Sequence, residues 1–189
     1  MSSYYYLIAQ LPSLSYAQPA PMTSERLREL CGDLMSVQDA AVLNRCALDP
    51  EAAEAGPSSP LVEAWLAWER ALRSALAKGR GQKLKRDPAT LVEPPADELD
   101  AIAVAKAALS MDSPLEAEFY LDRSRWEAVE KLQAGDYFDR DTVYAYMIKL
   151  LLLERKALFR VEEGFAEYKA IYASVMEAAS TSIASGEPK

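Results

Sequence analysis

The chain has 189 residues, of which 50% are hydrophobic and 26% are charged, and its formal net charge is −8. This size and mixture fit an ordinary folded domain, and the scarcity of glycine beside abundant alanine, leucine and glutamate favours helices over strands. Histidine is absent, which excludes Ser-His-Asp and Cys-His catalysis and His-ligated zinc, while the acidic charge argues against nucleic acid as a general partner.

The two cysteines, Cys31 and Cys46, are too few for a disulfide framework or a four-cysteine metal site. We interpret them as small core residues of a protein in a reducing compartment. The N-terminus shows no basic region before its YYYLIA run, so no secretion signal is expected. The apolar run at residues 143–153 contains Lys149 and is shorter than the roughly 20 residues of a membrane span. We therefore expect a cytoplasmic protein without a direct membrane span.

The N-terminal part of the chain contains short elements. Residues 4–11 are aromatic and apolar, and their pattern fits either a buried extended segment or a short helix. Prolines make residues 12–22 a loop, and the composition of residues 49–60 is typical of a connector.

Two helices are predicted between these loops from their capping residues. A helix over residues 24–35 starts at Thr23 or Ser24, whose hydroxyl can accept a backbone N–H at the helix start. A second, shorter helix follows from the capping box formed by Ser36 and Asp39.

Two longer helices start with serine followed by proline. Ser59 and Pro60 begin a helix that we expect to run to about Gly79. Ser113 begins another, which should continue to about residue 133. An alanine-rich helix over residues 97–109 is predicted between them.

A basic segment follows the first long helix. It contains Lys78, Arg80, Lys83, Lys85 and Arg86 and is closed by prolines. These side chains could contact phosphate or an acidic partner, although a solvated loop is the preferred interpretation.

The helix from residue 139 to residue 164 is expected to be central, because it is apolar on nearly every face and such helices are normally buried. Asp139 is its N-cap and Gly164 its stop. A last amphipathic helix over residues 165–179 follows, and the tail at residues 184–189 should fray. The fold class is therefore all-α, an irregular bundle of about six to seven helices within one domain, in which residues 1–90 and 91–183 could form two lobes.

A similar arrangement recurs in the two long helices that contain Glu69 and Glu154. Apolar residues occupy the same offsets, −7, −4, +3 and +7, around each glutamate, so each lies at the centre of an apolar stripe on one helical face. A bare carboxylate there would be unfavourable, so each should be paired with an arginine or capped by backbone donors.

The candidate structural buried charges are Glu69, Arg70, Glu154, Arg155 and Arg123, and the candidate partners of the glutamates are Arg70, Arg123 and Arg125. Two carboxylates in apolar surroundings are also compatible with acid–base chemistry or a metal site. No Gly-rich phosphate loop or polar cluster accompanies them in the sequence, so we prefer structural ion pairs. We predict no catalytic residue, cofactor or metal.

Three segments resemble helices of the C-type (also called d-type) connector of V-type and A-type ATPases. PLEAEFYLDRSRWEAVEKL, at residues 114–132, is similar to that family's "LE…LDR-aromatic…L" helix. AYMIKLLLLERKALFRVEEG, at residues 145–164, resembles its "Y…K…E-x-x-x-L…G" helix, and WLAWERALRSALAKGRG, at residues 65–81, resembles the same theme.

The opening YYYLIAQLPSL and the WERALR and ERKALF helices are more closely similar to a bacterial family of unknown function encoded among V-type ATPase genes. That family stands in for the C-type connector in operons without a normal one. The chain is much shorter than a three-lobed C-type connector and has room for roughly two such lobes.

The resemblance implies a non-catalytic central-stalk connector that links the rotor shaft subunit to the membrane rotor ring. Such a protein is cytoplasmic and is held at the inner membrane through the ATPase complex. The alternative interpretations are a stand-alone cytoplasmic helical adaptor or regulatory protein, and an enzyme or metal protein that uses Glu69 and Glu154.

Overall fold

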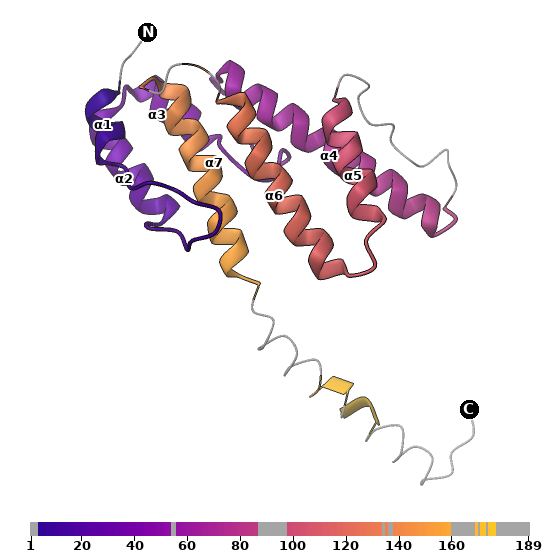
Figure 1. Cartoon of the computed structure of the whole chain (residues 1–189). Helices are drawn as coiled ribbons and strands as arrows, with labels where there is room; N and C mark the ends of the chain where they lie inside the picture. The colour runs from indigo at the N-terminus through magenta and orange to yellow at the C-terminus, as the bar shows by residue number, and fades with distance from the viewer. Residues whose placement is uncertain are drawn as a thin grey trace. The chain divides into compact units, whose positions relative to one another are not determined.

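The computed structural model (Figure 1) describes residues 4–53, 56–86, 98–133, 135, 138–159, 169, 171–172 and 174–176. It divides the chain into two compact units, Met1–Lys156 and Ala157–Lys189. The described residues form seven α-helices: α1 (Tyr5–Gln10), α2 (Ser24–Leu34), α3 (Val37–Asn44), α4 (Pro60–Lys83), α5 (Leu99–Leu109), α6 (Pro114–Leu132) and α7 (Arg140–Ala157). The predicted all-α class and number of helices are confirmed, and residues 4–11 contain a short helix rather than an extended segment.

The starts of five helices are determined by side-chain caps that the sequence predicted. In each case the side-chain oxygen accepts the backbone N–H of the residue three positions further on, over 3.0–3.3 Å. The capping residues are Thr23, Ser36, Ser59, Ser113 and Asp139.

The ends of the two long helices differ from those predicted. Helix α4 continues through Gly79 to Lys83, because Gly79 allows close packing rather than a stop. A Cβ atom at Gly79 would lie 2.2 Å from Cδ1 of Leu109 on α5. Helix α7 ends at Ala157, before the expected Gly164, which lies outside the described residues.

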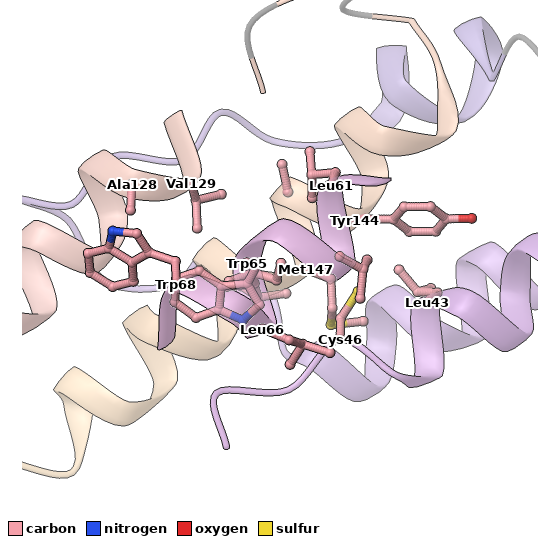
Figure 2. Close-up of a cluster of buried hydrophobic side chains, with 14 of the residues drawn as sticks. Leu43, Cys46, Leu61, Trp65, Leu66, Trp68, Ala128, Val129, Tyr144 and Met147 are labelled. Atoms are coloured by element: carbon pink, nitrogen blue, oxygen red, sulfur yellow. The ribbon is translucent and has the colours of Figure 1, made fainter. Parts of the chain in front are cut away.

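The first unit has a continuous core built around α4 and α7. Figure 2 shows the indole rings of Trp65 and Trp68 on α4 beside Tyr144 and Met147 of α7, together with Val129 of α6. The two indoles stack with their ring centroids 5.9 Å apart. The core thus contains residues from both sides of residue 90, where a boundary between two lobes was expected.

Helices α6 and α7 run antiparallel, as their side-chain contacts show. Arg155 near the end of α7 bonds Glu118 near the start of α6, over 2.9 Å. Lys149, earlier in α7, donates to Gln133 just after the end of α6, over 3.1 Å. This arrangement places the middle of α6 beside the C-terminal half of α7.

None of the helices in the described part of the chain is both long and apolar enough to cross a membrane. In the second unit, residues 169, 171–172 and 174–176 are helical, within the range predicted for the last amphipathic helix. Ile171, Tyr172, Val175 and Met176 are exposed there. The tail predicted to fray, residues 184–189, lies outside the described residues.

Candidate functional site

The centre of α4 holds a fully buried carboxylate, that of Glu69. Arg125 of α6 binds it in a bidentate fashion, with Nε donating to Oε2 and Nη2 donating to Oε1, each over 2.9 Å. Only 8% of the Arg125 side chain is exposed. A parallel pair of charge-assisted hydrogen bonds is the strongest geometry that a guanidinium and a carboxylate can adopt. The apolar stripe around Glu69 is therefore interrupted by a closed ion pair.

The ion pair extends into a network that joins α4, α6 and α7. Asp122, also fully buried on α6, accepts from Nη1 of Arg125 over 3.1 Å and from Nη1 of Arg155 on α7 through the same oxygen, Oδ1. Arg155 in turn donates to Glu118 of α6. Four charged residues thus connect Glu69 to α7 through α6.

Arg73 closes the outer side of the network. Its Nε donates to Oε1 of Glu69 over 2.9 Å, and its Nη1 lies 3.3 Å from Oδ1 of Asp49 in the connector before α4. A cavity of about 420 Å³ opens beside it, lined by Glu51, Arg73, Leu76, Ala77, Arg80, Glu118, Leu121, Arg125 and Arg155. The four arginines of this cavity bond carboxylates, so their charges are compensated within the fold.

Burial and pairing have opposite effects on the two innermost groups of the network. Burial raises the pKa of Asp122, because the attraction of Arg155 and Arg125 does not fully offset the loss of hydration. For Arg125, burial alone would lower the pKa, but hydrogen bonds and attraction from Glu69 and Asp122 raise it. No residue in the described part of the chain donates to Oδ2 of Asp122, which is consistent with a carboxyl group that retains its proton more readily than usual.

Glu154 has a different environment from Glu69, although the two occupy matching positions in the sequence. Its Oε1 accepts the backbone N–H of Ser24 over 2.6 Å, so it caps the first turn of α2. The side chain is only partly buried, because α7 leaves the first unit just beyond it and Ala157 is exposed. The prediction of a backbone-capped glutamate therefore fits, but full burial was wrong.

Three arginines considered from the sequence are placed differently. Arg70 and Arg123 are exposed, since they lie on the solvent sides of α4 and α6, and Arg123 pairs with Glu127 one turn away. Arg155 is half-buried and belongs to the network. The buried partner of Glu69 is Arg125.

Two network residues were not singled out from the sequence, Glu118 and Asp122. Together with Arg125 they are spaced four and three residues apart along α6, which places them on one helical face. That spacing was the signal available in the sequence.

A second buried polar cluster surrounds Asp39 of α3. Its Oδ2 accepts from the hydroxyl groups of Tyr4, over 2.5 Å, and Ser36, while its Oδ1 accepts from Arg140 and Tyr144 of α7. Burial alone would raise the pKa of Asp39, but the hydrogen bonds from Tyr4, Ser36 and Arg140 lower it. This cluster ties the N-terminal segment to α3 and α7.

The chemistry of these clusters is that of structural support. Both oxygens of Glu69 are bonded to arginine, and no group of three or more acidic or cysteine side chains able to hold a metal occurs in the described residues. No family model, curated protein or solved structure matches the chain.

Proposed function

We propose that the protein is a non-catalytic connector in the central stalk of a V/A-type rotary ATPase. It would bind the rotor shaft subunit and the membrane rotor ring on the cytoplasmic side of the inner membrane. Its proposed task is mechanical coupling between the shaft and the ring during ion transport, with no turnover of its own.

One observation supports this proposal above the others. The three segments that resemble helices of the C-type connector meet in a single buried network. Residues 65–81 contribute Glu69, residues 114–132 contribute Arg125, and residues 145–164 contribute Arg155. The charged letters of the resemblance are therefore the contacts that join three long helices.

Such a network suits a part that transmits force. Breaking a buried ion pair leaves an uncompensated charge in the interior, at about 3–5 kcal/mol, so relative sliding of α4, α6 and α7 is strongly opposed. The stacked indoles of Trp65 and Trp68 add close packing to the same region. A body of this kind resists shear between its helices.

The proposal is tested by affinity purification of the tagged full-length chain from membranes that contain its own ATPase. Mild detergent is used, and the recovered subunits are quantified by mass spectrometry. We expect the shaft subunit and the ring subunit in amounts comparable to the tagged chain. Tagged chain that is denatured and captured in the same way serves as the control for nonspecific recovery.

Recovery of neither subunit by a chain whose circular dichroism is that of a folded helical protein would contradict the proposal. Stoichiometric recovery of a different protein would instead favour a stand-alone adaptor.

A further inference from the structure

The C-terminal ends of α4 and α5 meet at a basic groove. Gly79 of α4 packs directly against Leu109 of α5, and Nζ of Lys83 donates to the carbonyl oxygen of Leu109 over 2.5 Å. These contacts bring the last turns of both helices together, even though 15 residues separate the two helices in the chain.

The groove beside this junction has a volume of about 650 Å³, and its lining combines apolar and basic side chains. It is formed by Gly79, Gln82, Lys83, Lys106, Leu109, Ser110, Met111 and Asp112. A second cavity of about 330 Å³ shares four of these residues and continues between the helices past Ala75 and Ile102. Leu84, at the end of α4, is also largely exposed.

Basic residues outnumber acidic ones around the groove. They are Lys78, Arg80, Lys83, Lys85, Arg86 and Lys106. The negative ends of two helices together amount to about one elementary charge. Arg80 lies 3.7 Å from Glu118, and Asp112 supplies one carboxylate in the lining. An excess of positive charge remains at this position on a chain whose formal net charge is −8.

Lys83 and Lys106 are the cations that line the groove. An ammonium group has three donors, so the bond from Lys83 to Leu109 leaves two for another acceptor. Lys106 is exposed and has no ion-pair partner among the described residues. Both are placed to bind carboxylates above an apolar floor.

We propose that this groove binds an acidic amphipathic segment of a partner protein. Carboxylates on one edge of the segment would contact Lys83 and Lys106, and its apolar side chains would cover Leu109 and Met111. This pairing of apolar anchors with a charged rim is the usual mode by which a groove holds a helix. No aromatic side chain lines either cavity, so the stacking platforms typical of single-stranded nucleic acid binding are absent there.

A concave groove with an apolar floor also fits a peptide better than a flat anionic membrane surface. The inference does not depend on the ATPase proposal. Its test uses a synthetic peptide, so it can fail or succeed separately from the recovery of ATPase subunits.

The probe is a fluorescein-labelled helical peptide of roughly four turns, about 15 residues, with Leu on one face and Glu beside it. Binding to the full chain is measured by fluorescence anisotropy at low and high salt. We expect binding that weakens as salt screens the charges, and that weakens about tenfold or more in the Lys83→Glu/Lys106→Glu variant. The single variant Lys106→Glu leaves the bond from Lys83 to Leu109 in place and should show part of the loss.

The matched control is Arg123→Glu/Lys131→Glu, which makes the same change in net charge at exposed positions of α6. It should bind the peptide as the wild type does. Equal affinity for a peptide in which Gln replaces Glu, or equal loss in the control variant, would overturn the proposal. So would binding of phosphatidylglycerol vesicles that depends on Lys106 while peptide binding does not.

Discussion

Arg125 grips both oxygens of Glu69 across the interface between α4 and α6, although the two residues are 56 positions apart in the chain. Neither group reaches bulk water to any large extent, so each depends on the other for its hydrogen bonds. The pair therefore determines how α4 and α6 align more than it determines the total stability of the protein.

Removing one partner should be far more harmful than removing both. We expect Glu69→Ala to lower the free energy of unfolding by about 3–5 kcal/mol, because it leaves Arg125 buried and short of acceptors. The double variant Glu69→Leu/Arg125→Met should recover most of this loss. Urea unfolding followed by circular dichroism measures both, and equal losses in the single and double variants would contradict the interpretation.

A smaller effect is expected at Glu154. Its carboxylate accepts the N–H of Ser24 and is only partly buried, so Glu154→Ala should reduce stability by about 1–2 kcal/mol, as for the loss of a helix cap. Arg70→Ala is the control at an exposed position, where a change within about 0.5 kcal/mol is expected. A loss at Glu154 as large as that at Glu69 would show that the two glutamates are equivalent after all.

The two buried aspartates should give opposite dependences of stability on pH. Burial raises the pKa of Asp122 above the ordinary 3.8, so the folded state holds this proton more tightly and the contribution of Asp122 to stability falls as the pH rises through that raised pKa. For Asp39, burial would also raise the pKa, but its hydrogen bonds lower it, so its contribution is present above 3.8 and is lost as the pH falls through the lowered value.

Chemical unfolding at a series of acidic pH values tests this difference. The stability gap between the wild type and Asp122→Asn should narrow as the pH rises, whereas the gap for Asp39→Asn should widen. Gaps that run parallel across the series would mean that neither carboxyl group has a shifted pKa.

Gly79 and Gly32 form a matched pair for testing the close contact between α4 and α5. Replacing an exposed helical glycine with alanine stabilises a helix by up to about 1 kcal/mol, and a Cβ atom at Gly32 in α2 meets nothing within 4 Å. At Gly79 the same atom forces Leu109 to move, so Gly79→Ala should gain less than Gly32→Ala or should destabilise the protein. Thermal unfolding of both variants provides the comparison, and equal gains would mean that Leu109 yields freely.

Local signals explain how much of the fold could be predicted. The starts at Ser59 and Ser113 were found because a capping hydroxyl and a following proline act within one turn of helix. The end of α4 could not be found in this way, because Gly79 looks like a stop until Leu109 is known to lie against it. Tertiary contact there overrides the local preference.

The candidate site shows the same division. An apolar stripe centred on Glu69 predicted that this residue needs a partner, but only the fold could select Arg125 over the exposed Arg70 and Arg123. Glu154 has an equivalent pattern in the sequence, yet it meets the start of α2 instead of an arginine. Sequence periodicity identifies the face of a helix, whereas the element opposite that face depends on the path of the whole chain.

The attachment of the N-terminal segment has a consequence for synthesis on the ribosome. The N–H of Tyr4 bonds the carbonyl oxygen of Phe138, and the carbonyl oxygen of Pro12 accepts from the hydroxyl of Tyr146, each over 2.9 Å. The first residues to emerge therefore wait for nearly the last part of the unit before they can dock. At about 5–20 residues per second this delay is roughly 7–27 seconds, during which the exposed aromatic side chains of Tyr4, Tyr5 and Tyr6 depend on chaperones or on their own solubility.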